Sequence, residues 1–353
     1  MAGIGLPTPS AEQRLLVART LHRHRMRAVT VSVALIAATF AVFCVSISVG
    51  DFPVPLRDVV AAVFGHGNPD SDFIVRTLRM PRALNGLLVG AAFGLSGSLF
   101  QLLARNPLAS PDVIGITAGS STAAVLMIVV VRATSAAVSL GALGGALLTA
   151  LAIYVLAYRR GVSSYRLVLV GIGVAAVLNA VTSYLLTRAE IFDAQRAAVW
   201  LTGSLNGRGW DELRPLTVTM ALLAPLAVAL ARPLRALLLG DDTACGIGVA
   251  VERSKLVLTL VAVGLCAVAT AAAGPVAFVA FVSGPVARRL TGHGALALVP
   301  SALVGALLLL LSDLAARRLF APTELPVGVV TGVIGAPYLL WLIARTNRTG
   351  RAG

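Results

Sequence analysis

Long apolar segments follow one another along most of this chain, and short polar segments separate them. A helix needs about 20 mostly apolar residues to cross the hydrocarbon core of a bilayer. No stretch has the mixed pattern of a soluble second domain. The sequence therefore predicts an all-α integral membrane protein with ten transmembrane helices, at about residues 28–50, 81–104, 113–131, 134–158, 165–187, 213–231, 255–273, 275–290, 295–314 and 326–344.

The distribution of charge predicts which ends of these helices face the cytoplasm. The chain has 29 Lys and Arg against 15 Asp and Glu, a formal net charge of +14. In a soluble protein this surplus would point to nucleic acid, but 58% of the residues here are hydrophobic and 12% are charged. With the N-terminus inside, 18 of the 29 basic residues fall on the cytoplasmic side and 10 of the 15 carboxylates on the other. This is the positive-inside pattern, so we expect both termini in the cytoplasm and no nucleic-acid partner.

The same pattern divides the chain into three parts. Residues 1–27 are polar and rich in arginine, and 28–345 form the transmembrane domain, with a cytoplasmic tail at 346–353. A secretory signal peptide is the alternative for the start, but its apolar core usually spans only 7–15 residues. The longer run at 28–50 favours an uncleaved first helix. The second to fifth and the seventh to tenth helices would have opposite orientations, so an inverted repeat is expected.

The sequence shows neither carboxylates in the middle of the transmembrane segments for ion coupling nor a phosphate-binding loop for ATP. No Asp or Glu lies in the middle of a predicted helix, whereas ion-coupled carriers place carboxylates there. Lys255 is the only lysine and follows no glycine-rich loop, so the chain has no phosphate-binding loop for ATP. Its three cysteines and four histidines show no metal-ligand spacing. We expect a pore driven by a partner, with no catalytic residues, no metal site and no cofactor.

Several segments, in this order along nearly the whole chain, resemble the FecCD-type permeases of bacterial ABC importers. They are Leu78–Arg82, Gly90–Gly97 with Gln101, Arg105–Asp112, Trp200–Leu205, Gly274–Val279, Glu324–Gly328 and Gly335–Pro337. The resemblance implies a permease subunit in the bacterial cell membrane that moves ferric siderophores. It is closest to enterobactin-like permeases, with cobalamin or haem as the alternative cargo. A secondary carrier and a membrane enzyme are the alternatives from other classes.

The resemblance also implies partners and site residues. The partners are ABC ATPase subunits, a second permease chain that is either a copy or a paralogue, and a siderophore-binding lipoprotein or periplasmic protein. In such permeases arginines on the outer face meet acidic residues of the binding protein, and the matching positions here are Arg79, Arg82 and Arg317. Exposed arginine suits carboxylate recognition, although arginines at helix ends also reach lipid headgroups.

Two more functional regions come from the resemblance. The stretch at about 232–254 is similar to the segment that couples the permease to its ATPase. Its named positions are Asp241, Asp242, Thr243, Ala244, Gly246, Gly248 and Val249. Asp241 or Asp242 could cap a helix that begins near Thr243, and Gly248 could end it; an ordinary polar loop is the alternative. Asn106, Ser163 and Ser164 resemble polar residues that line the inner gate.

Overall fold

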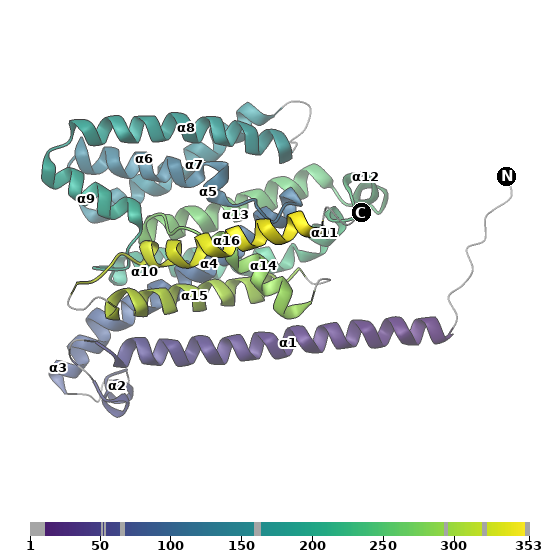
Figure 1. Ribbon diagram of the computed structural model, residues 1–353, viewed down its shortest axis with the longest axis horizontal. Coiled ribbons are helices and arrows are strands. Elements are labelled where there is room, and N and C mark those ends of the chain that lie inside the picture. The colour runs from purple at the N-terminus through teal and green to yellow at the C-terminus, as the bar shows by residue number, and fades with distance from the viewer. Residues whose placement is uncertain are drawn as a thin grey trace.

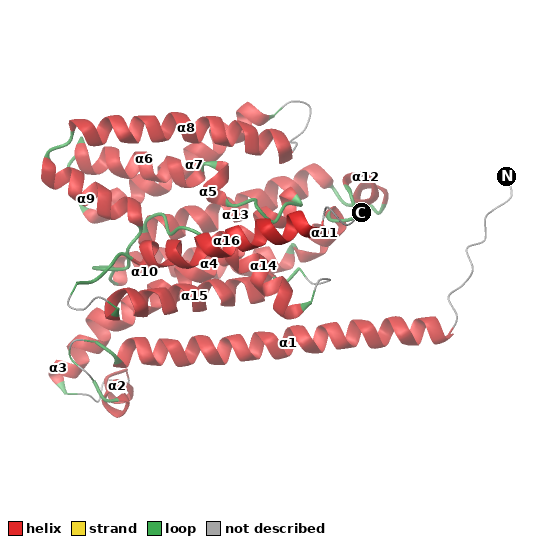
Figure 2. Cartoon of the chain, in the orientation of Figure 1, coloured by secondary structure: helices red, strands yellow, loops and turns green. Residues whose placement is uncertain are grey.

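The computed structural model describes residues 11–50, 52, 54–63, 68–158, 164–292, 296–319 and 323–349, and these ranges contain helices, turns and loops but no strand (Figure 2). The helices are α1 Ala11–Ser48, α2 Leu56–Val63, α3 Pro69–Asp72, the π-helix η1 Phe73–Arg79, α4 Met80–Ala104, α5 Pro111–Ile114, α6 Ile116–Val129, α7 Ser135–Ala157, α8 Ser164–Arg188, α9 Ile191–Thr202, α10 Trp210–Ala229, α11 Ala231–Leu237, α12 Asp241–Gly246, α13 Val251–Ala273, α14 Val279–Thr291, α15 Leu298–Arg318 and α16 Val327–Thr349.

The long helices lie side by side in one bundle (Figure 1). The helix α4 occupies its middle and packs against α10, α13, α14 and α15. One end of the bundle carries α2, α3 and α9, and we call it the α3 end. The opposite end carries α11 and α12, and we call it the α12 end. The first turn of α1 and the last turn of α16 both lie toward the α12 end (Figure 1).

Seven helices of the described chain are long and apolar enough to cross a membrane. They cover Met26–Ser48, Pro69–Ala104, Ser135–Ala157, Arg166–Arg188, Trp210–Ala229, Val251–Ala273 and Leu298–Arg318. The remaining three predicted segments coincide with α6, α14 and α16. Leucine, valine and phenylalanine side chains on the outside of the bundle are widely exposed, for example Leu148 at 69% and Phe40 at 66%. Such an apolar surface suits lipid rather than water. The fold is that of an α-helical membrane protein.

Two boundaries differ from the sequence prediction for local reasons. The helix predicted at 113–131 is broken into α5 and α6, because Gly115 adopts φ +90°, a left-handed conformation that ends one helix before the next begins. The first helix starts at Ala11 rather than near residue 28. No glycine or proline interrupts the chain between residues 11 and 49, so the helix continues through the polar segment.

Glycines let α4 approach its neighbours closely. A β-carbon on Gly90 would lie 2.4 Å from the carbonyl oxygen of Gly305 in α15, and one on Gly305 would lie 2.1 Å from that of Gly90. On the same face, a β-carbon on Gly97 would lie 1.9 Å from the carbonyl oxygen of Ala280 in α14. These backbones therefore pack in direct contact, as small residues allow in membrane bundles.

We expect Gly305→Ala to destabilise the protein, because its methyl group would collide with the α4 backbone. Overpacking of this kind costs about 1–3 kcal/mol. The melting temperature of the purified protein in detergent should fall by several degrees. Gly144→Ala in α7 is the matched control, since nothing lies within 4 Å of the added carbon. Equal melting temperatures for the two variants would contradict the close approach.

Candidate functional site

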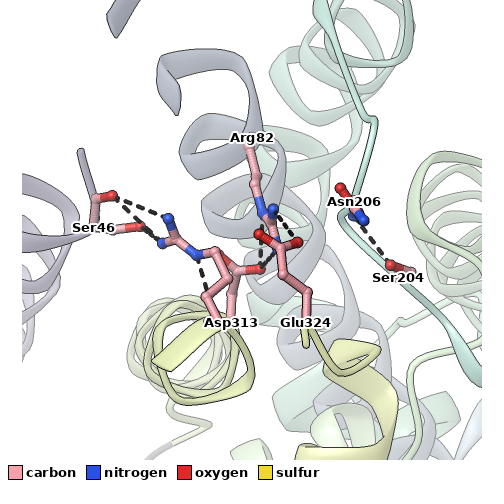
Figure 3. A network of polar contacts seen from close by, with 7 residues as sticks. Ser46, Arg82, Ser204, Asn206, Asp313 and Glu324 are labelled. Carbon is pink, nitrogen blue, oxygen red and sulfur yellow. Dashed lines mark hydrogen bonds and ion pairs between the residues drawn. The ribbon is translucent and has the colours of Figure 1, made fainter. Parts of the chain in front are cut away.

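A network of arginines and carboxylates joins three parts of the chain at the α3 end (Figure 3). Arg82 of α4 donates from Nε and Nη2 to Oδ1 of Asp313 at 3.1 and 3.0 Å. It also donates from Nη1 to Oε2 of Glu324 at 3.0 Å. Arg317 lies one turn after Asp313 in α15, and its Nε is 3.1 Å from Oδ2 of Asp313. Its Nη2 donates to the hydroxyl of Ser46 in α1 at 2.6 Å.

This network is largely shielded from solvent. The side chain of Asp313 is 1% exposed, and those of Arg82 and Arg317 are 14% and 11% exposed. Burial of a carboxylate is costly unless opposite charge and hydrogen bonds compensate for the lost water. Two guanidinium groups meet that need for Asp313. The network therefore ties α1, α4 and α15 together, and Glu324, 35% exposed, is its outermost member.

Arg79 also reaches α1. Its Nη1 donates to the carbonyl oxygens of Ile47 and Ser48 at 2.9 and 3.1 Å. These carbonyls belong to the last turn of α1, which has no later helical N–H groups to bond. A cation there also interacts favourably with the helix dipole. Arg79 thus caps α1.

All three arginines predicted to dock a binding protein lie at the α3 end, within one region of the fold. Each of them contacts groups of its own chain, as described above. Their role toward a partner stays a prediction.

Two hollows open beside this network. The first, which we call the rim hollow, has a volume of about 450 Å³ and is lined by Arg79, Arg82, Arg317 and Glu324 among others. The second, which we call the side hollow, has a volume of about 810 Å³ and lies against α9 and the loop that follows it. Asn206, Gly207, Arg208 and Glu324 line both hollows. The two hollows therefore adjoin one another.

At the α12 end, Asp241 connects three segments. Its Oδ1 accepts a hydrogen bond from Nη2 of Arg105 at 2.9 Å, and its Oδ2 pairs with Nζ of Lys255. The pKa of Asp241 lies below its usual value, chiefly because Lys255 donates this hydrogen bond, with the charges of Lys255 and Arg105 adding to the effect. A depressed carboxyl pKa stabilises the fold above the ordinary pKa, and this contribution is lost only as the pH falls through the lowered value. The carboxylate is thus charged at neutral pH.

The helix at 241–246 corrects the predicted cap. The sequence predicts that Asp241 or Asp242 caps a helix starting near Thr243, but α12 starts at Asp241 and Gly240 is its N-cap. Gly240 has φ +110°, which a residue with a β-carbon would adopt only with strain. The carboxylate of Asp241 is used instead for Arg105 and Lys255. Gly248 has φ +84° just after the helix, in agreement with the predicted end.

The segment around α12 presents apolar side chains to solvent. Leu239 is 67% exposed and Ile247 is 63% exposed, whereas Ala244 between them is fully buried. Asp242, Thr243 and Gly246 are exposed, and Val249 is half-buried. Apart from the buried Ala244, the predicted coupling positions therefore lie along one segment that is mostly exposed, Leu239 to Val249, which we call the α12 knob.

The predicted gate residues are partly described. Asn106 lies in the exposed turn after α4, where its side-chain oxygen accepts a hydrogen bond from the Leu108 N–H at 2.9 Å. Ser164 is the first residue of α8, and Ser163 lies outside the described residues. Of the three residues, only Asn106 has a described side chain.

Sequence reasoning missed several members of these sites. Asp313 and Arg317 are four residues apart in the sequence, so their pairing within one helix could have been inferred. The contact between Arg82 and Asp313 spans 231 positions, and that between Arg105 and Asp241 spans 136. Nothing in a single sequence indicates such pairs. Among the described residues, no group of three or more His, Cys, Asp or Glu could hold a metal ion.

Comparison with known proteins gives the class of the molecule. The fold superposes with a TM-score of 0.81 on a solved structure described as an inward-facing conformation of a metal-chelate type ABC transporter, at 24% identity, over 90% of this chain and 99% of the other. It also resembles PsaBC from Streptococcus pneumoniae, with a TM-score of 0.55 at 14% identity, over 81% of this chain and 94% of the other. The chain thus shares its all-helical fold with these two structures.

Sequence comparison then gives the family. Residues 34–345 match the FecCD transport family, and the chain belongs to it. The ferric enterobactin transport system permease protein FepG of Escherichia coli is 43% identical over 85% of this chain and 91% of its own length. The probable siderophore transport system permease protein YfhA of Bacillus subtilis is 38% identical over 90% and 95%. The family consists of transport permeases rather than enzymes.

We expect Asp313→Asn to be strongly destabilising, because it leaves the guanidinium groups of Arg82 and Arg317 buried without their shared carboxylate. Breaking a buried pair costs about 3–5 kcal/mol. Arg132→Gln is the control. It removes ion pairs with Glu190 and Asp193 from an arginine whose side chain is 61% exposed, and exposed pairs are worth about 0–1 kcal/mol each. Melting temperatures in detergent test this difference, and similar losses in the two variants would contradict it.

Proposed function

We propose that this chain is the permease subunit of an ATP-driven importer that carries ferric siderophores across the bacterial cell membrane. The observation that carries the proposal is the similarity, over most of its length, to permeases named for ferric enterobactin and other iron(III) chelates. Two features of the chain support it. No carboxylate lies in the middle of a described span to couple transport to an ion, and the α12 knob offers a contact surface at one end of the bundle.

The importer would place the α12 end in the cytoplasm. The proposed topology has ten spans, formed by the seven long helices together with α6, α14 and α16. Basic residues gather toward the α12 end, as the positive-inside rule requires. The first turn of α1 and the last turn of α16 lie toward that same end (Figure 1). This agrees with the proposed cytoplasmic segments at 1–27 and 346–353. An inverted repeat of the second to fifth and seventh to tenth spans remains part of this proposal.

The transport complex would comprise this permease, a second permease chain, ATPase subunits and a siderophore-binding protein. The ATPase would hold the α12 knob, because an exposed leucine and isoleucine on either side of a short helix suit an apolar groove. Arg79, Arg82 and Arg317 are the proposed contacts for the binding protein at the α3 end. Asn106, Ser163 and Ser164 are the proposed gate residues.

Transport in reconstituted vesicles tests the function. The permease, its ATPase and its binding protein should take up iron-55-labelled ferric siderophore only when ATP is present. Replacement of the phosphate-binding lysine of the ATPase should abolish uptake, because the permease has no nucleotide site of its own. Uptake at an unchanged rate with that inactive ATPase would overturn the proposal and favour a secondary carrier.

We expect Ile247→Asp to weaken the contact with the ATPase by at least about tenfold, since it places a charge in the proposed apolar contact. The variant should fail to co-purify with the ATPase at concentrations where the unaltered complex stays intact. Ile191→Asp in α9 is the matched control, because Ile191 is 80% exposed at the opposite end of the bundle. Co-purification of both variants to the same extent would contradict the role of the α12 knob.

A further inference from the structure

The helix α1 continues past the end of its membrane-spanning part. It has 38 residues, of which Met26–Ser48 form the span. At 1.5 Å per residue, the residues 11–25 add about 22 Å to the helix. The headgroup layer on each side of a bilayer is only about 5–7 Å thick. Because α1 runs along the bundle and reaches past α12 (Figure 1), most of this part lies outside the lipid. We call residues 11–27 the α1 extension.

The bundle holds α1 at both ends of its span. Nε of Arg27 donates to the carbonyl oxygen of Leu290 at 2.8 Å, and Nη2 donates to that of Arg289 at 3.4 Å. These carbonyls belong to the last turn of α14, where no later helical N–H group can bond them. At the other end, Arg79 caps α1. The α1 extension thus continues an anchored helix without a nucleation step of its own, and a partner would not have to order it first.

The α1 extension carries a basic stripe. Arg19, His22, Arg23 and Arg27 are exposed and follow one another at three- and four-residue spacing, which places them along one side of the helix. Over its whole length the extension contains five arginines and one glutamate. The stripe begins at Arg27, on the side of α1 that contacts α14. Fixed charges of one sign attract a partner of opposite charge and set how it docks.

The α12 knob alone is small for a stable protein contact. Such an interface takes about 20–30 residues from each partner, about twice what the segment from Leu239 to Val249 offers. A protein seated on the knob would therefore cover more of the α12 end, and the α1 extension projects from that same end (Figure 1). Lipid headgroups would reach only the first turn of the extension next to the membrane. A protein with an acidic surface suits the remainder better.

We infer that the α1 extension is a second contact for the ATPase, with Arg19 and Arg23 facing an acidic patch on that subunit. The inference rests on the proposed function and adds a contact that the α12 knob does not supply. The two contacts would engage different helices. The knob is joined to α4 and α13 through Asp241, whereas the extension is joined to α14 through Arg27.

Charge reversal tests the contact. The permease in nanodiscs of uncharged phosphatidylcholine is titrated with the ATPase at low ionic strength. Arg19→Glu combined with Arg23→Glu should raise the dissociation constant at least about tenfold. The difference should shrink as salt is added, because exposed charges are screened.

The matched control is Arg57→Glu combined with Arg76→Glu. It changes the net charge by the same amount through two exposed arginines of α2 and η1 at the opposite end of the bundle. Its affinity for the ATPase should equal that of the unaltered permease, and melting temperatures confirm that both double variants are folded. Equal affinities of the two double variants would overturn the inference.

Photo-crosslinking gives an independent measure of proximity. A benzophenone-bearing residue in place of His22 should crosslink to the ATPase on irradiation. The same residue in place of Phe40, which is 66% exposed within the span of the same helix, should crosslink to lipid. Crosslinks from position 22 to lipid alone would overturn the inference, since the α1 extension would then be a membrane contact.

The α12 knob separates this inference from the proposed function. If the ATPase binds the unaltered permease and Ile247→Asp prevents this while the reversal of Arg19 and Arg23 has no effect, only the α1 extension has been assigned wrongly. If the unaltered permease binds no ATPase and ATP-dependent uptake fails, the proposed function itself is wrong.

Discussion

The direct backbone contact of α4 with α14 and α15 is the constraint on which the rest of the structure depends. Glycines at the crossing leave no room for side chains, so α4 cannot shift sideways without moving α14 and α15. Both candidate sites are attached to this helix. Arg82 in its first turn enters the carboxylate network, and Arg105 just after its last residue pairs with Asp241. With 25 residues, α4 spans about 37 Å between them.

Much of this fold could be predicted from the sequence, because the main signal is simple. Apolar runs long enough to cross a bilayer identify the long helices. The orientation that the asymmetry of arginine predicts stays a prediction. The break at Gly115 and the early start of α1 were missed for a common reason. Each depends on local backbone geometry, whereas hydropathy reports only which side chains prefer lipid. Short helices outside the apolar runs, such as α12, come from the same local geometry and from contacts with neighbouring segments.

The sequence indicates where the candidate site residues lie in the fold, but not which residues they contact. The motifs put arginines at one end and the 232–254 stretch at the other, and the structure has them there. The partners of these arginines come from distant parts of the chain: Arg82 meets Asp313 and Glu324, which no periodicity links to it. Only the folded structure shows that the Nε1–H of Trp200 and the Nε–H of Arg208 are buried without an acceptor. A single sequence records which groups exist but not which of them lack a partner.

Ion pairs connect each end of the bundle to its central helices. Near one end, Asp313 is paired with two arginines. At the other end, a force on the α12 knob would reach α4 through Asp241 and Arg105, and α13 through Lys255. Because α4 moves with α14 and α15, a displacement at that surface would change the helix packing at the opposite end, where the two hollows lie.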